Sequence, residues 1–568
     1  MTPEMSLPSF KGSGRSPIAI HDQLGHTIAG DRLPLRFSLL DGDGAPPSVL
    51  SYNSAIAILK EPATAEQESM TVPMKEYKRR EGRLELDPTI NSDIRDILAG
   101  VERFKQYNIH EQIDDDPVTD AIGLGPGEYR VPNKDRFPYP FPHDAYYMAK
   151  GDRNTEYGRK LVETFLDKQV QLYKRFKIMP NFGAYGSLNT GSPEFFIPMA
   201  MEWYDSHPGK ETDEIKDKLK IYMEVGADEH DTVWNNPRDL TGAIGSYHHM
   251  VPGYKYLRRV GDRDAGYATN AGREWVWDFS SVRGAGSEDA LLPICVNTIL
   301  ASNKETFGRA AEILGMETLG GRTPQEWRSE SAEMKQEINT FLYNPETKNY
   351  HDRDYKDNIL REESTLAAVW ALWGEVASGE QAMDVIRNLE RLDHGHGLVV
   401  TAPEDFAPEI PDEAFLKLGI PKRYIKAIQR QLDPANWDGN VWPPPLITMK
   451  EGILKYVRST DKGLSPADKL VMTRFAIRQT ENEIKTQMNI RNTTNGKFSE
   501  KWKADGTDDN GHFHYEPQQN GLGWSATLAE LNVTQFLPEL YSLEDELEML
   551  IAAEQQPVSV PIFESVSA

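Results

Sequence analysis

The sequence predicts an all-α protein built as a barrel of helices, preceded by an N-terminal extension of different character. Three observations predict this class. From about residue 145 onward apolar residues recur at helical spacing, as at Leu161, Phe165, Leu172 and Phe176. Strand signals are few, and long loops rich in Trp, Pro, Asn and Gly connect the helices. In a helical barrel the helices form the wall, and loops at one end build the functional site.

The apolar spacing places about eleven helices along this part of the chain. In chain order they are expected at 157–176, 215–225, 290–301, 305–314, 324–342, 364–376, 381–392, 422–432, 446–457, 466–486 and 525–536.

The first 125 or so residues differ from the rest. Short strand-like segments at 33–40 and 54–59 are separated by Gly, Pro and Asp. One helix is expected at 92–107, where Ile94, Ile97, Leu98 and Val101 share a face. The extension is therefore expected to be an arm or a small cap that includes β-structure.

Composition excludes several classes of partner. The 568 residues include 88 acidic and 63 basic side chains, which gives a formal net charge of -25. A chain this acidic is unsuited to nucleic acid or to an anionic membrane surface. The single cysteine, Cys295, excludes an internal disulfide framework and a Cys-rich zinc site. No signal-like start or 18-residue apolar run occurs, so a soluble cytoplasmic protein is expected.

The first candidate site is the aromatic loop 272–281, which carries Glu274, Trp277 and Asp278. A carboxyl group beside a Trp ring loses solvent, which raises its pKa and suits it to act as a general acid. The alternative is an Asp that caps the next helix. A second candidate is Glu500, between Phe498 and Trp502; its alternative is an exposed Glu paired with Lys501.

Two further loops suit sugar binding. One holds Trp437, Asp438 and Trp442, and the other is 520–525, with Trp524. Aromatic rings stack on the C–H faces of sugars, and Asn or Asp side chains bond adjacent hydroxyls. The alternative is a pair of rigid loops that pack on the barrel.

These segments together resemble the trehalase family, glycoside hydrolase family 37. The similar segments run in the same order from about 128 to 535: WDFSS at 277–281 preceded by Glu274, and the stretches 180–196, 429–445, 498–502 and 517–527. Arg136 and Asp144 lie in a segment that resembles the family more loosely.

The resemblance implies an (α/α)6 barrel and an inverting α-glycosidase acting on a small α-glucoside, α,α-trehalose first. It implies Asp278 as general acid and Glu500 as general base, with no metal or other cofactor and a small-molecule substrate, a disaccharide, as partner. The expected substrate-binding residues are Arg136, Asp144, Asn181, Glu274, Trp277, Trp437, Asp438, Trp442, Tyr515, Glu516 and Trp524. The implied domains are an extension at 1–127, the catalytic barrel at 128–545 and a tail at 546–568.

The sequence departs from the family at residues that hold sugar hydroxyls. Ala184 and Thr190 stand where the family has arginines, and the segment 260–271 is too short for a further one. His143 replaces the tryptophan before Asp144, and Tyr515 replaces a glutamate, with Glu516 shifted by one. Three alternatives therefore stay open. The first is an α-glucosidase like those of the related glycoside hydrolase family 63, because NWDGNVWPP at 436–444 resembles the WRGPVWPP pattern of that family. The second is a diverged enzyme that uses the same acids on a non-sugar substrate, by cyclisation or dehydration. The third is a non-catalytic binding protein.

Overall fold

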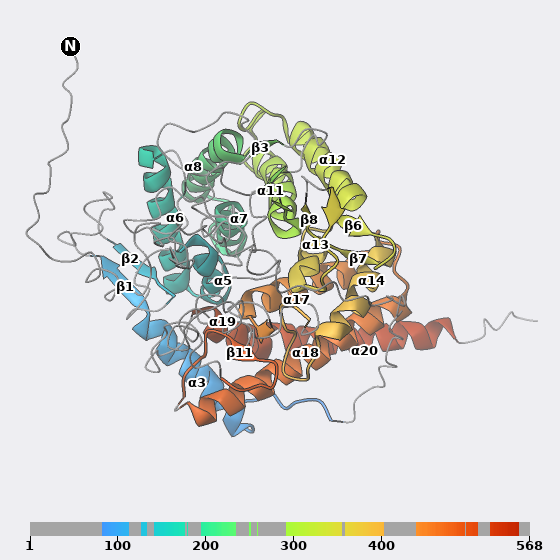
Figure 1. The fold of residues 1–568 in the computed structure, drawn as a ribbon. Helices are drawn as coiled ribbons and strands as arrows, with labels where there is room; N and C mark the ends of the chain where they lie inside the picture. Colours follow the sequence, from blue (N-terminus) through green and yellow to red (C-terminus); the bar gives the residue numbers. More distant parts are fainter. Residues whose placement is uncertain are drawn as a thin grey trace, which may run out of the picture.

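The computed structural model describes residues 82–112, 127–132, 141–176, 179, 195–234, 249–250, 258–259, 291–354, 358–402, 439–494, 496–508 and 523–555 (Figure 1). Helices dominate these residues, and the strands among them are only two to four residues long.

Among the described residues, six helices form a closed inner ring (Figure 1). Each contacts the next in chain order, and the last contacts the first. They are α5(Pro142–Asp152), α7(Phe196–Ser206), α11(Ile294–Ile313), α13(Val369–Trp373), α17(Pro443–Arg458) and α19(Gly523–Leu531). An outer helix returns the chain between each consecutive pair, so the inner helices all run in one direction.

The outer helices lie around this ring (Figure 1). Those that separate the inner ones are α6(Glu156–Phe176), α8(Asp213–Glu229), α12(Pro324–Leu342), α14(Gly379–Leu389) and α18(Pro466–Thr493). Two more complete the layer: α3(Ser92–Tyr107) packs against α19, and α20(Leu537–Glu554) packs against α18. Three outer helices begin at capping boxes, opened by Thr323, Ser378 and Ser465, which satisfy the first free N–H groups.

Inner and outer helices bury different fractions of their surface. Every residue of α5 is buried, as is every residue of α13. In the outer helix α12 only one face is buried, formed by Trp327, Ser331, Met334, Ile338 and Leu342. The inner helices therefore supply most of the core, and the outer ones cover it with an amphipathic face.

The strands form small antiparallel pairs at the helix ends. They are β1(Ile109–Gln112) with β2(Gly127–Arg130), β3(His249–Met250) with β4(Arg258–Arg259), β6(Tyr343–Asn344) with β7(Asn349–Tyr350), and β10(Asn440–Val441) with β11(Trp502–Lys503). A three-stranded sheet has the order β5(Leu291–Leu292), β8(Arg353–Asp354), β9(Ile359–Leu360).

The helix predictions are confirmed at 92–107 and 324–342, whose bounds match α3 and α12. The prediction of two helices at 290–301 and 305–314 was wrong, because α11 runs through both. The polar residues Asn303 and Lys304, between the two expected segments, are buried within this helix. The expected helix 466–486 continues to Thr493 as α18.

Three helices were not expected: α5, α7 and α20. Since α5 is buried all round and α7 nearly so, neither shows the polar face on which periodicity depends. The expected helix 422–432 and the strand-like segments 33–40 and 54–59 lie outside the described residues.

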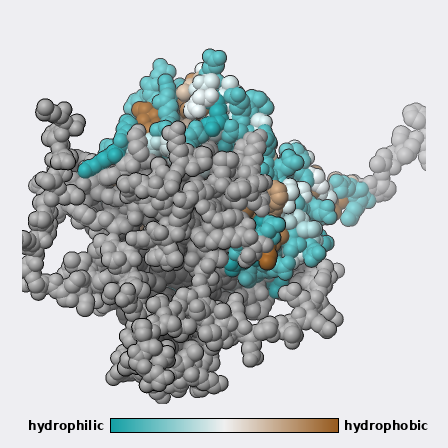
Figure 2. All heavy atoms as spheres, turned by 45° about the horizontal axis from the view of Figure 1, so that its top comes forward, coloured by the Kyte–Doolittle hydropathy of each residue, from teal (hydrophilic) through white to brown (hydrophobic). Residues whose placement is uncertain are grey.

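The described surface in Figure 2 is mostly hydrophilic, with a few separate hydrophobic spots. The most exposed large apolar side chains come from different elements, among them Ile90, Ile359 and Met549. Within the described part of the chain, no helix is both long and apolar enough to cross a membrane.

Candidate functional site

Aromatic rings gather where the inner helices begin. The ring of Trp442, the residue before α17, lies 5.7 Å from that of Trp524 in α19. His143 in α5 lies 5.8 Å from Trp524 and 5.2 Å from Phe195, the residue before α7. Phe195 in turn lies 5.9 Å from Trp370 in α13. These ring contacts join five inner helices at the same end of the barrel, which we call the aromatic end.

The helix directions make the aromatic end electrostatically favourable for acids. Each helix N-terminus carries a partial positive charge, and here several N-termini converge. Asp144 is in the first turn of α5 and is buried, with 8% of its surface exposed. A carboxylate in that position is stabilised by the free N–H groups of the helix.

Glu500 is held at this end through its backbone. Its carbonyl oxygen accepts a hydrogen bond from Trp524 Nε1 at 2.9 Å and another from Ser525 Oγ at 3.2 Å. Two residues later, Trp502 of β11 pairs with Val441 of β10, and Trp502 Nε1 donates to the His396 carbonyl at 2.7 Å. The segment that carries Glu500 is therefore fixed on both sides, while its side chain is half-buried.

Two of the tryptophans predicted to bind substrate lie in the described residues, and both are almost fully buried, with 2% of Trp442 and 6% of Trp524 exposed. Lys501 Nζ lies 5.2 Å from the centre of the Trp442 ring, and Lys501 itself is buried. Since the Trp524 N–H group bonds the Glu500 carbonyl, that group is committed to the protein.

The structure thus brings together Asp144, Trp442, Glu500 and Trp524 of the residues predicted from the sequence. The predicted general acid, Asp278, lies outside the described residues. The same holds for Arg136, Asn181, Glu274, Trp277, Trp437, Asp438, Tyr515 and Glu516.

His143 was missed among the sequence candidates, although its replacement of the family's tryptophan was a signal. It is 7% exposed and packs edge-on against Tyr147 at 5.2 Å, in addition to its contacts with Phe195 and Trp524. Burial lowers the pKa of its imidazole from the usual 6.5 to about 3. His143 is therefore neutral near pH 7.

The opposite end of the inner ring holds a group of charged side chains around the buried Lys150. Lys150 Nζ lies 2.6 Å from Glu202 Oε1 and 2.8 Å from Glu451 Oε1, and its side chain is fully buried. Arg153 Nη1 also reaches Glu202, at 2.8 Å. Burial by itself raises the pKa of Glu202. The nearby cations of Lys150 and Arg153 lower this pKa by more, so the pKa of the carboxyl lies below its usual range. We call Lys150, Arg153, Glu202 and Glu451 the axial charge cluster.

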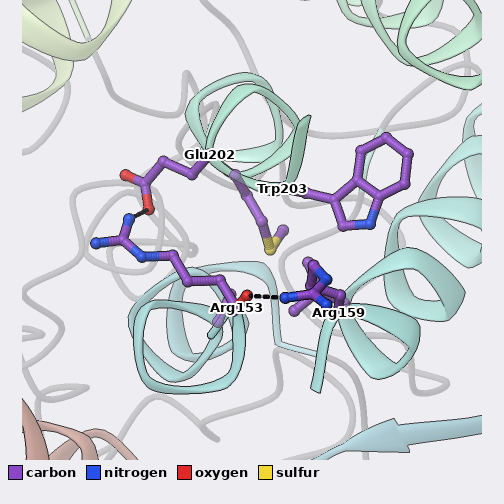
Figure 3. A pocket seen from close by; sticks show the side chains of 7 residues that line it. Arg153, Arg159, Glu202 and Trp203 are labelled. Carbon is purple, nitrogen blue, oxygen red and sulfur yellow. Dashed lines mark hydrogen bonds and ion pairs between the residues drawn. The ribbon is translucent and has the colours of Figure 1, made fainter. Parts of the chain in front are cut away.

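A small hollow beside this cluster lies between α5, α6 and α7 (Figure 3). Its lining includes Arg153, Arg159, Glu202 and Trp203. These side chains already bond within the protein: Arg153 pairs with Glu202, and Arg159 Nη1 donates to the Arg153 carbonyl at 3.0 Å (Figure 3). The hollow leaves no room for a water-sized sphere, so it offers a substrate no site.

Across the described residues, no group of three or more His, Cys, Asp or Glu side chains is placed to hold a metal ion. Cys295 is buried in the first turn of α11.

An inner ring of six parallel helices inside an outer helical layer defines the class of (α/α)6 barrels, and Asp144 and the Glu500 backbone lie at its aromatic end. The comparisons with known proteins agree with this class. The sequence profile of the trehalase family matches residues 53–536. The chain therefore belongs to the trehalase family, which confirms the resemblance seen in its motifs.

Individual relatives are distant. The chain is 25% identical over 389 residues to a cytosolic neutral trehalase of Kluyveromyces lactis, an alignment that covers 60% of this chain. It spans about half of that relative's length, 48%. The neutral trehalase Nth1 of Saccharomyces cerevisiae superposes with a TM-score of 0.53 at 16% identity, over 78% of this chain and 82% of that one. This likeness confirms the predicted (α/α)6 fold.

A glycoside hydrolase family 63 mannosylglycerate hydrolase from Thermus thermophilus also aligns, with 13% identity and a TM-score of 0.48. That alignment covers 77% of this chain and 99% of the other.

Proposed function

We propose that this protein is an inverting α-glycosidase that hydrolyses α,α-trehalose. The observation that carries the proposal is membership of the trehalase family together with Glu500, whose backbone is fixed at the aromatic end by Trp524 and Ser525. In this proposal Glu500 is the general base, and Asp278 is the general acid.

An inverting reaction assigns the two carboxyl groups opposite tasks. Asp278 protonates the glycosidic oxygen as it leaves, and Glu500 takes a proton from the water that attacks the opposite face of the sugar. Both groups can act only if a water molecule fits between Glu500 and the sugar, which is why the base must be held rigidly. The bonds from Trp524 Nε1 and Ser525 Oγ to the Glu500 backbone provide that rigidity.

The neutral substrate agrees with the composition of the chain. With a formal net charge of -25, the protein would repel anionic ligands over long distances and leave a neutral disaccharide unaffected. The name of the Kluyveromyces relative also favours a cytosolic location for this chain, which fractionation of the source cells would test.

The decisive experiment measures glucose release from trehalose by the wild type, Asp278→Asn and Glu500→Gln. We expect activity in the wild type and a loss of at least about 100-fold in each variant, the scale that general acid–base catalysis contributes. Early NMR spectra should show one β-glucose and one α-glucose per trehalose cleaved, because inversion affects only one of the two glucosyl units.

Two results would contradict the proposal. A wild type that is inert on trehalose and on a panel of other α-glucosides would remove the glycosidase function and favour the non-sugar alternative. Two α-glucose molecules at early times would indicate retention, and would assign Glu500 a role other than that of base.

A further inference from the structure

A buried polar atom at the aromatic end has no hydrogen-bond partner. The Nε2 atom of His143 is shielded from solvent and makes no hydrogen bond to any residue that the structure describes. The contacts of the imidazole are instead with the rings of Tyr147, Phe195 and Trp524.

This arrangement is costly for the folded protein. A nitrogen buried without a partner loses its hydrogen bonds to water and gains none in return. A phenylalanine would fill the same aromatic surroundings without that cost. A polar atom retained in such a place therefore calls for a specific explanation.

The position of His143 suggests what that explanation is. The Trp524 ring lies 5.8 Å from the His143 ring, and the N–H group of the same tryptophan holds the Glu500 carbonyl. His143 is thus one side chain removed from the proposed general base. It also directly precedes Asp144 in the first turn of α5.

The chemistry of the imidazole limits what it can bind. Burial lowers the pKa of the His143 ring to about 3, so the ring is neutral at any higher pH. A neutral ring offers one N–H donor and one nitrogen acceptor and carries no charge. A hydroxyl group both donates and accepts, so either ring nitrogen can pair with it. A phosphate or carboxylate would gain no charge pairing from the neutral ring, whereas a hydroxyl needs none.

We infer that His143 is a specificity-determining residue whose Nε2 atom hydrogen-bonds one hydroxyl of the sugar unit bound beside Glu500. This inference rests on the proposed function, because it takes the ligand to be a glucoside. The folded protein accepts an unpaired nitrogen, and the bound sugar satisfies it. A sugar that lacks this hydroxyl leaves the nitrogen buried and unpaired, and is therefore rejected.

The test compares His143→Phe, which keeps a ring of similar size and removes both nitrogens, with His143→Gln, whose amide nitrogen lies near the Nε2 position. Each variant and the wild type are assayed on trehalose and on a set of monodeoxy-trehaloses. Unliganded melting temperatures are recorded in parallel. His394→Phe, at an exposed histidine, controls for the substitution itself.

We expect kcat/KM for trehalose to fall by about 10- to 100-fold in His143→Phe, with an unliganded melting temperature equal to or above that of the wild type. The wild type should discriminate against one deoxy analogue in particular, and His143→Phe should lose that discrimination while keeping the others. His143→Gln should restore part of both. His394→Phe should match the wild type.

The inference is overturned if the wild type hydrolyses trehalose and His143→Phe keeps kcat/KM within about twofold with unchanged discrimination among the deoxy analogues. His143 would then be a packing residue, whatever its effect on melting. A lowered melting temperature together with a uniform loss of activity on all analogues would also overturn it. Failure of the proposed function is seen separately, in a wild type that cleaves no α-glucoside.

Discussion

At the scale of single residues, the main feature of this protein is how Glu500 is held. The bonds to its carbonyl come from Trp524 and Ser525, 24 and 25 residues further along the chain. They act on the backbone, so they position the proposed base without engaging its carboxylate. This gives Trp524 a positioning role beside the substrate-binding role that the sequence suggests.

The two roles of Trp524 predict different kinetics. Trp524→Phe keeps an aromatic ring and removes the N–H donor, and Ser525→Ala removes the second donor. If these two donors position Glu500, kcat for trehalose should fall about fivefold in each variant. This fall corresponds to about 1 kcal/mol for the loss of one hydrogen bond. KM should change little. A raised KM with unchanged kcat in Trp524→Phe would show instead that the indole binds substrate directly.

His143 also predicts how stability depends on pH. The unfolded imidazole takes up a proton as the pH falls below about 6.5, whereas the folded one stays neutral until its pKa of about 3 is reached. Protonation therefore favours the unfolded state, and stability is lost as the pH falls from 6.5 towards 3, by about 1.4 kcal/mol per pH unit.

Urea unfolding at pH 7 and pH 5 measures this effect. Relative to the wild type, His143→Phe should lose about 2 kcal/mol less stability between the two pH values. Contributions of the other titratable groups are common to both proteins and cancel in the comparison. An identical loss in the two proteins would mean that His143 is already protonated in the folded state at pH 5.

Among the secondary-structure elements, the inner helices are held together by contacts at both of their ends. The N-termini of five of them meet at the aromatic end, and three of them, α5, α7 and α17, also meet at the axial charge cluster. Lys150 is fully buried there, between the carboxylates of Glu202 on α7 and Glu451 on α17. A cation near the C-terminus of α5 is also favoured by the negative end of the helix dipole. The cluster therefore joins three inner helices across the barrel axis.

Removing the central cation should destabilise the barrel strongly. Lys150→Met leaves the part-buried Glu451 without its cation, and breaking a fully buried pair costs about 3–5 kcal/mol, which is the upper limit here. Lys216→Met is the matched control, because Lys216 pairs with the exposed Glu211 at the surface. We expect a clear fall in melting temperature for Lys150→Met and almost none for the control. Equal melting temperatures would show that the cluster adds no net stability.

At the same scale, sequence patterns predicted the outer helices better than the inner ones. Helix α12 shows one apolar face and a capping box, and its bounds were predicted from the sequence. Helix α5 is buried on every side, so its sequence PHDAYYMAKGD carries no contrast between faces. The capped and amphipathic elements are thus the ones that local sequence specifies.

At the scale of the whole molecule, the formal net charge of -25 and the proposed neutral substrate predict the response to salt. Added salt screens the repulsion among the acidic side chains and should raise the melting temperature. Catalysis should respond differently, because trehalose carries no charge for the protein to steer. From about 20 to 500 mM NaCl we expect kcat/KM to change by less than about twofold. A steep fall with salt would indicate a charged substrate.

The order of the motifs along the chain identifies the family and predicts the chemistry of the site. The motifs that carry Asp278 and Glu500 occur along the chain in the same order as in the family. Such motifs are recognisable because the residue types that a ligand-binding loop can use are limited at each position. The family profile, which matches residues 53–536, agrees with them.

How these parts are supported depends on contacts that form only in the folded barrel. The bond from Trp524 to the Glu500 carbonyl, the unpaired Nε2 atom of His143 and the pairing of Lys150 with Glu451 each join segments, or depend on surroundings, that are remote in the sequence. The physical reason is that burial and hydrogen bonding depend on which side chains meet across the barrel. The spacing of apolar residues in the sequence predicts only which face of a helix is buried.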